Sequence, residues 1–447
     1  MAANTAIFKY KYNYLRVMSN KEKSSYQSID SVFNDSNVGK EVSLRGWVYR
    51  IRPQKNYTFL TLRDSSGIIQ TVFATTPETE KLTLESSVEL SGIVKKDARS
   101  PGGYELEGRI LAPYHIAQDF PIKEHQSTEL LNEWRHLWNR SRRMTNIMKI
   151  KAATLTYARD WLNKNEWYEV TPPIINKGAC EGGSTLFKID YFGEEANLSQ
   201  SAQLYLESLI FSLDKVWSIT PSFRAEKSKT PRHLAEFWHL EAEMAWGGFD
   251  DLISVKERLI EHICNQLAEK NYKEIEAVGG DPVHLKNIKA PFERWPHAKA
   301  IQFLNKKGFN LPPDGNFGTK EERELTIDLK QPIVIYGAPV SARPFYTKIN
   351  PLDEKMVLSA DIIAPRGFGE LTTGGQREEN LERIVERIKK EGFDPKNFEW
   401  YLDLRRYGSV PHSGFGLGIE RILRWICNFE HIREAIPFPR TMNIVYP

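Results

Sequence analysis

Two stretches of the sequence gather charged and aromatic side chains of the kind that bind a nucleotide. The first begins at Phe223 and reads FRAEKSKTPRHLAEFWHLEAEMAW. Beyond Leu234 its residues alternate in character, so the predicted strand has one apolar face and one polar, aromatic face with Phe237, His239, Glu241 and Glu243. A strand that turns such a polar face inward lines a site.

The segment from Glu226 to Arg232 predicts an exposed turn between two antiparallel strands, because serine, threonine and proline stand there among charges. Arg224 precedes the turn and His233 follows it, so both basic side chains are placed to bind phosphates. The second stretch, GFGLGIER, ends at Arg421. Its glycines permit close backbone approach, and the apolar residues that follow predict a helix with Arg421 at its start.

These stretches resemble the second and third signature motifs of class II aminoacyl-tRNA synthetases, which activate an amino acid with ATP and load it onto tRNA. The resemblance implies catalytic roles for Arg224, Glu226 and Arg421. It implies an ATP site made of Arg224, Glu226, Arg232, His233, Phe237, Glu370 and Arg421. Arg224 would hold the α-phosphate and the substrate carboxylate. His233 and Arg421 would reach the γ-phosphate, and Phe237 would stack on adenine.

Two acidic residues predict a metal site beside the triphosphate. Asp361 and Glu370 bracket a turn ahead of the segment GGQR. Mg²⁺ takes one or two carboxylates together with phosphate oxygens, so this pair fits Mg²⁺ as the cofactor. The implied reaction needs no protein nucleophile, because the α-carboxylate of an amino acid attacks the α-phosphorus itself. The protein positions the reactants and stabilises charge.

The elements that must position these residues fall into two predicted domains. We expect a flexible tail over residues 1–25, an OB-fold barrel over 26–116, a linker over 117–140 and a catalytic domain over 141–447. Five strand-like runs between residues 38 and 115, separated by turns, predict the barrel. The resemblance implies an α+β chain whose catalytic domain has an antiparallel sheet flanked by helices. The fold of residues 270–330 is left open.

The predicted barrel resembles the anticodon-binding domain of the aspartyl, asparaginyl and lysyl subgroup. By that resemblance Phe59 stacks on the middle anticodon base and Gln70 bonds its edge, which makes tRNA a partner. Stacking one base on an aromatic ring contributes ~1–3 kcal/mol. The alternative for a phenylalanine in a barrel is packing in the core.

A predicted helix that begins near residue 143 leads into the segment WYEVTPPII. This resembles the first class II motif, a helix and strand at a dimer interface, with Pro173 as the hallmark proline. Glu166 replaces the family's glycine and Trp167 its phenylalanine, so this motif matches least well. The homodimer follows only from the resemblance.

The residues that choose the amino acid favour asparagine. Aspartyl enzymes carry a lysine where this chain has Leu206, and an aspartate where it has Glu241. Losing that cation disfavours a charged substrate by several kcal/mol. Arg377 could donate to the side-chain carbonyl of asparagine and Glu241 could accept from its amide, while aspartate would meet like charge. The implied amino-acid site consists of Glu181, Gln203, Arg224, Glu241 and Arg377, with Leu206 and Glu241 setting specificity.

The segments YLDLRRYGSVPHSGFGLGIERIL and HIREAIPFPRT also resemble archaeal-type and eukaryotic cytosolic asparaginyl-tRNA synthetases. We therefore expect an asparagine-tRNA ligase that uses ATP, L-asparagine and tRNA-Asn. Two alternatives stay open. One is an aspartyl-tRNA synthetase, which could have relaxed specificity, and the other is a tRNA-independent asparagine synthetase-like paralogue, which would not need an anticodon reader.

Composition limits the remaining choices. The chain has 447 residues and a net charge of +3, so any nucleic-acid partner must be bound by local patches. The three cysteines are far apart, and they suit a reducing cytoplasm rather than a disulfide framework. No apolar run approaches the ~18–20 residues of a membrane span. We expect neither a membrane nor DNA as a partner. The first 25 residues are a tail, a tRNA-binding arm or a weak transit sequence, and Met1 or Met18 is the start.

Overall fold

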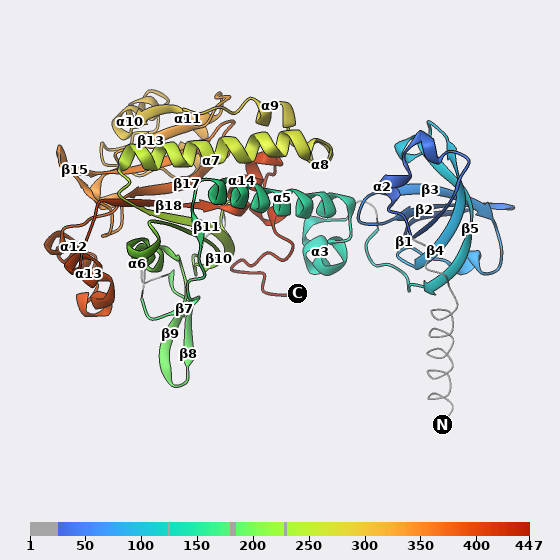
Figure 1. Cartoon of the computed structure of the whole chain (residues 1–447), viewed down its shortest axis with the longest axis horizontal. Coiled ribbons are helices and arrows are strands. Elements are labelled where there is room, and N and C mark those ends of the chain that lie inside the picture. The colour runs from blue at the N-terminus through green and yellow to red at the C-terminus, as the bar shows by residue number, and fades with distance from the viewer. Residues whose placement is uncertain (1–25, 124–125, 179–184, 228–229) are drawn as a thin grey trace. The chain divides into compact units, whose positions relative to one another are not determined.

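The computed structural model describes residues 26–123, 126–178, 185–227 and 230–447. The chain divides into two compact units, Met1–Thr128 and Glu129–Pro447, and Figure 1 shows the elements of each. The predicted tail over residues 1–25 lies outside the described ranges. None of the helices in these ranges is long and apolar enough to cross a membrane.

The first unit is a closed barrel of five strands in the order β1-β2-β3-β5-β4. Its strands are β1 (Glu41–Pro53), β2 (Tyr57–Arg63), β3 (Ile68–Ala74), β4 (Ser87–Lys96) and β5 (Tyr104–His115), and the short helix α2 (Ile29–Val32) precedes them. Alternate residues point inward, so Leu44, Leu60, Ile69 and Leu90 are fully buried in one core. The five predicted strands and the barrel are confirmed.

An eight-stranded sheet in the order β12-β13-β16-β17-β18-β11-β10-β6 forms the second unit. Its strands are β6 (Tyr168–Glu169), β10 (Lys215–Phe223), β11 (Glu236–Ala245), β12 (Glu293–Pro296), β13 (Ile333–Tyr336), β16 (Ser359–Ala364), β17 (Gly369–Gln376) and β18 (His412–Gly418). The five pairings from β13 to β10 are antiparallel, whereas β12 and β6 join the two edges in parallel. The predicted antiparallel sheet is confirmed.

Helices bury one face of this sheet. The long helices α5 (Arg142–Lys164) and α7 (Phe249–Lys270) lie side by side along it, as Figure 1 shows, and α14 (Ile419–Ile426) follows β18 directly. Apolar residues of these helices pack with Trp217, Leu240 and Phe415 of the sheet in one large core. The opposite faces of the central strands are therefore free to carry polar side chains.

Smaller elements surround the sheet. They are α3 (Thr128–Glu133), α4 (Arg135–Trp138), β7 (Ile175–Asn176), β8 (Lys188–Tyr191), β9 (Glu194–Leu198), α6 (Gln203–Leu213), β14 (Ile349–Asn350), β15 (Asp353–Val357), α12 (Leu381–Lys390) and α13 (Glu399–Arg406). Residues 270–330, whose fold was left open, form α8 (Tyr272–Val278), α9 (Pro282–Lys286), β12, α10 (His297–Lys306) and α11 (Thr319–Thr326).

The boundary between the two units falls inside the predicted linker over residues 117–140, whose part from Glu129 on is mostly helical and belongs to the second unit. Arg135 of α4 is 2% exposed, and its guanidinium donates to the backbone carbonyls of Arg433, Ile436 and Pro437. A buried cation that satisfies three carbonyls fixes this helix to the C-terminal segment.

Candidate active site

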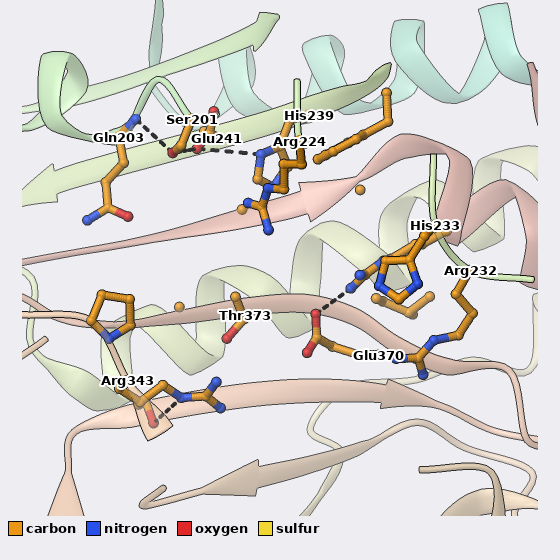
Figure 2. A pocket seen from close by; sticks show the side chains of 18 of the residues that line it. Ser201, Gln203, Arg224, Arg232, His233, His239, Glu241, Arg343, Glu370 and Thr373 are labelled. Atoms are coloured by element: carbon orange, nitrogen blue, oxygen red, sulfur yellow. Dashed lines mark hydrogen bonds and ion pairs between the residues drawn. The ribbon is translucent and has the colours of Figure 1, made fainter. Parts of the chain in front are cut away.

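A cavity of about 320 Å³ lies on the polar face of strands β17, β18 and β11, and Figure 2 shows side chains that line it. Its walls also include the beginnings of α6 and α14 and the loop before β14. The predicted site residues that line it are Gln203, Arg224, Glu226, Arg232, His233, Phe237, Glu241, Glu370, Arg377 and Arg421. Residues from five separate parts of the chain thus meet at one cavity.

The predicted antiparallel hairpin is confirmed. Strands β10 and β11 pair with Ser222 opposite Phe237, and the turn between them carries Arg224 and His233. Phe237 and its alternate neighbours line the cavity, whereas Leu240 is fully buried on the apolar face. The alternation of the sequence therefore identifies the cavity-lining face.

One end of the cavity is rich in cations and aromatic rings. The guanidinium of Arg224 lies 5.5 Å from the centre of the Phe237 ring. The imidazole Nε2 of His233 lies 3.5 Å from the carboxylate of Glu226. Burial lowers the pKa of His233, and Arg421 and two other arginines lower it further against the opposing effect of Glu226. An imidazole there is neutral near pH 7 and can donate to a phosphate without adding charge.

Arg232, predicted to bind ATP, lines the cavity but is paired with Glu322 of α11. Its Nη2 lies 3.2 Å from one oxygen of Glu322, and the other oxygen accepts the backbone N–H of Glu370 at 2.7 Å. Glu322 therefore links the turn after β10 to strand β17. It belongs to the region whose fold was left open, and no motif in the sequence singles it out.

Only one of the two predicted metal ligands lines the cavity. Glu370 lines it and pairs with Arg421 at 2.5 Å, whereas Asp361 accepts from Thr373 and pairs with Arg343. Burial tends to raise the pKa of Glu370, but Arg421, Arg343 and Arg232 together lower it. The Glu370 carboxylate is therefore ionised at neutral pH.

At the other end of the cavity, Glu241 is 3% exposed and held by two donors. Its carboxylate accepts from the Ser201 hydroxyl and from the backbone N–H of Ala202 at 2.7 Å, as Figure 2 shows in part. Burial raises the pKa of Glu241, and these hydrogen bonds oppose that shift. Ser201 stands in the segment QSAQ, but its contact with Glu241 depends on pairing across forty residues of sequence.

Arg377 pairs with Glu243, a residue of the predicted polar face that was not assigned a role or a partner. The Arg377 Nε lies 3.1 Å from one Glu243 oxygen and the Nη2 donates to the other, so the contact is bidentate. The same guanidinium lies 5.3 Å from the centre of the Tyr346 ring. A Cβ on Gly414 would lie 2.0 Å from the Glu243 carboxylate, so the glycine makes room for this pair.

Leu206, predicted to set specificity, lies away from the cavity. Leu206 is fully buried in an apolar cluster with Ala202, Ile210 and Val216, and it does not line the cavity. Leu206 therefore does not touch a substrate bound in the cavity, and its role in specificity stays a prediction. Glu181 lies outside the described residues. Gln203 does line the cavity, and its amide donates to Glu207 at 3.0 Å.

In the barrel, Phe59 and Gln70 lie outside the core on adjacent strands. Phe59 pairs with Val72 and Thr61 with Gln70, which makes the two predicted residues diagonal neighbours on the outer face. Phe59 is absent from the buried core cluster, and Gln70 donates to Glu105 at 3.1 Å. The core alternative for Phe59 is therefore excluded. Pro173, in the second unit, is exposed.

Comparisons with known proteins agree with this geometry. Residues 126–442 match the family model of the class II tRNA synthetases (D, K and N), and residues 42–109 match that of the OB-fold nucleic acid binding domain. The chain is 49% identical to the asparagine-tRNA ligase of Thermococcus gammatolerans over 92% of this chain and 96% of the relative.

Solved structures give the same result. The crystal structure of asparaginyl-tRNA synthetase from Pyrococcus horikoshii with asparaginyl-adenylate has a TM-score of 0.91 and 47% identity, covering 96% of this chain and 100% of that chain. The Entamoeba histolytica asparaginyl-tRNA synthetase with asparaginyl-adenylate has a TM-score of 0.83 and 34% identity, covering 92% and 97%. The chain belongs to the asparaginyl-tRNA synthetase family, within the class II synthetases of the aspartyl, lysyl and asparaginyl group.

Proposed function

We propose that this cavity activates L-asparagine with ATP to give asparaginyl-adenylate and pyrophosphate, and then transfers asparagine to the 3′ end of tRNA-Asn. The observation that carries the proposal is the pair of opposite groups at one end of the cavity. Glu241 offers an acceptor and Arg377 a donor, and both line the same space. A side-chain amide needs one of each.

The charge balance at that end favours a neutral side chain. Glu243 neutralises Arg377 through the bidentate contact, so the guanidinium acts as a hydrogen-bond donor rather than as an uncompensated cation. Glu241, whose carboxylate lies 3.5 Å from His239 Nδ1, adds a carboxylate oxygen at this end of the cavity. Aspartate would bring a second carboxylate into this space, which the cavity rejects by like-charge repulsion.

The cationic end suits ATP. Phe237 supplies a ring face for adenine, and Arg224, His233 and Arg421 supply donors for the phosphates. Arg224 lies close enough to Phe237 to hold the α-phosphate beside the bound nucleoside. The cations stabilise the charge that develops when the asparagine carboxylate attacks the α-phosphorus. Pyrophosphate leaves toward His233 and Arg421.

Magnesium fits this site as an ion bound jointly with ATP. Among the described residues, no three His, Cys, Asp or Glu side chains are grouped so that they could bind a metal ion by themselves. The ionised Glu370 and the nearby Thr373 hydroxyl line the cavity, which suits Mg²⁺ with phosphate oxygens as its other ligands. When bound, the ion would neutralise phosphate charge. Asp361 would act behind Thr373, through its hydrogen bond.

The barrel supplies tRNA recognition. Phe59 is placed to stack on an anticodon base, and Gln70 is placed to bond a base edge, because both lie on the outer face. An intact anticodon reader sets this proposal apart from a tRNA-independent asparagine synthetase. We also propose a homodimer. It is supported by an exposed apolar stretch that follows β6 in the chain and consists of Pro173, Ile174 and Ile175, the two isoleucines being 38% and 45% exposed. Light scattering of the purified chain tests the homodimer.

ATP-pyrophosphate exchange tests the activation step. The full chain should exchange pyrophosphate into ATP with asparagine, and exchange with aspartate should be at least about a hundredfold slower in kcat/KM. Exchange driven by aspartate alone would instead identify an aspartyl enzyme. Formation of free asparagine from aspartate, ATP and ammonia without tRNA would identify the synthetase-like alternative.

A further inference from the structure

Helices α12 and α13 form a small helical pair that packs against the catalytic unit without entering its active site. Ile384 and Ile388 of α12 and Tyr401 of α13 are fully buried in a cluster with Phe345 and Tyr346. Figure 1 shows the pair at one end of the unit, near α6. No residue of α12 or α13, both of which are fully described, lines the cavity.

The loop over residues 343–347 does line the cavity. Arg343 reaches into it and pairs with Asp361, and Tyr346 contributes the ring that faces the Arg377 guanidinium. Figure 2 shows Arg343 near Thr373 and across the cavity from Gln203 and Glu241, and the Arg343 charge contributes to the lowered pKa of Glu370. The loop therefore reaches the end that we assign to asparagine through Tyr346, and the Glu370 side of the cavity through Arg343.

Arg387 of α12 binds this loop from behind through three backbone carbonyls. Its Nη2 donates to the carbonyl oxygens of Arg343 at 2.7 Å and Pro344 at 2.9 Å, and its Nη1 donates to that of Thr347. The residue is 6% exposed. Three carbonyls of one short loop converge on one planar guanidinium, a geometry that only arginine provides.

The same helical pair reaches a second part of the cavity wall. Arg405 of α13 donates to Glu207 at 2.8 Å, and Glu207 accepts from the cavity-lining Gln203 at 3.0 Å. Tyr401 also donates to Glu207, at 2.7 Å. Both contacts lead to residues at the asparagine end.

We propose that Arg387 is a positioning residue of the asparagine site. It holds the 343–347 loop so that the Tyr346 ring stays against the Arg377 guanidinium and Arg343 stays paired with Asp361. It does not touch the substrate. The inference rests on the proposed function, because it concerns the affinity of the same cavity for asparagine.

The loop is also held by the buried Phe345 and by the backbone N–H of Glu378, which donates to the Tyr346 carbonyl at 2.9 Å, so loss of Arg387 should displace it rather than unfold it. Without the guanidinium, the carbonyls of Arg343 and Thr347 lose this donor, whereas that of Pro344 keeps the Thr347 N–H at 3.0 Å. Buried carbonyls that lose a donor favour a shift of the loop that restores a hydrogen bond. A displacement of about 1 Å in a positioning element is enough to cost up to about a hundredfold in activity. The loss should fall on asparagine more than on ATP, because Phe237, Arg224 and His233 are carried by the β10–β11 hairpin.

The test is ATP-pyrophosphate exchange by the full chain with R387M, R387K and the control R383M. Arg383 lies one turn earlier on α12, with a side chain 45% exposed and 3.8 Å from Glu354. We expect R387M to raise the KM for asparagine about tenfold or more, while the KM for ATP changes by less than about threefold. R387K should fall between R387M and the unmodified chain, and R383M should match the unmodified chain.

The two hypotheses fail in different ways. If the unmodified chain shows no asparagine-dependent exchange, the proposed function fails. If it does, and R387M changes both KM values equally or only lowers the melting temperature, Arg387 is structural and the inference is wrong. If R387M does not fold, R387K decides the question, because lysine keeps the charge and the apolar stem of the side chain. An unchanged KM for asparagine in R387K would then overturn the inference.

Discussion

Replacing Glu241 with glutamine should weaken the discrimination between asparagine and aspartate. The substitution keeps the shape of the side chain and removes one buried charge from a position that is 3% exposed. One acceptor oxygen remains for the Ala202 N–H, which lies 2.7 Å from the carboxylate in the native chain. The Ser201 hydroxyl can reverse its role, so the fold should tolerate the change.

The magnitude follows from the loss of charge. A substrate carboxylate about 4 Å from Glu241 would be repelled by about 4 kcal/mol at an effective dielectric constant of about 20, which is nearly a thousandfold in binding. Asparagine would lose a hydrogen bond to a charged acceptor, worth about 1.5–3 kcal/mol. The ratio of kcat/KM for asparagine to that for aspartate should therefore fall by about two orders of magnitude or more.

ATP-pyrophosphate exchange at saturating ATP, with each amino acid in turn, measures this ratio. Glu236→Gln is the matched control, because it makes the same chemical change at the first residue of β11, outside the cavity. The control should keep the native ratio. An unchanged ratio in Glu241→Gln would refute the assignment of Glu241 as the residue that rejects aspartate.

Three further predictions concern other parts of the molecule. Gly414→Ala places a Cβ 2.0 Å from the Glu243 carboxylate, so kcat/KM for asparagine should fall about tenfold to a hundredfold from an overpacking cost of about 1–3 kcal/mol. Phe59→Ala should weaken tRNA binding by about 1–3 kcal/mol, which appears as a higher KM for tRNA. Pyrophosphate exchange, which does not use tRNA, should be unchanged. Burial lowers the pKa of Lys256, which donates to the Ala360 carbonyl, to about 8. The lysine binds its proton more tightly in the unfolded chain, where its pKa is the ordinary 10.5. The free energy of unfolding should therefore rise by about 3 kcal/mol between pH 8 and 10.5. This rise should be absent in Lys256→Met.

Each of these predictions has a contradicting result. Native exchange kinetics in Gly414→Ala would show that the pairing of Glu243 with Arg377 is dispensable. An unchanged KM for tRNA in Phe59→Ala would exclude anticodon stacking. Urea unfolding curves that keep the same pH dependence in Lys256→Met would show that the buried lysine is not the source of the slope.

Local periodicity was sufficient to predict the elements that carry the site. Alternation placed Phe237 and Glu241 on one face of a strand, and five short alternating runs predicted the barrel. Glycines in the GFGLGIER stretch predicted a close approach, and Gly414 makes room for Glu243. These features depend on a few neighbouring residues, so one sequence is enough to recognise them.

Contacts between distant strands could not be predicted in the same way. The partner of Arg377 is Glu243, which is 134 residues away, and the choice between Glu241 and Glu243 depends on the register of three strands. Leu206 was assigned to the specificity site by its position in a motif, but the helix turns it into an apolar cluster. A lysine there would enter that cluster, so Leu206→Lys tests folding as much as specificity.

The most direct test is aminoacylation of transcribed tRNA-Asn and tRNA-Asp by the full chain, with asparagine and aspartate supplied separately. We expect asparaginyl-tRNA-Asn as the main product and at least about a hundredfold less of every other pairing. Aspartylation of either tRNA at a comparable rate would contradict the assignment of the Glu241 and Arg377 end of the cavity to asparagine.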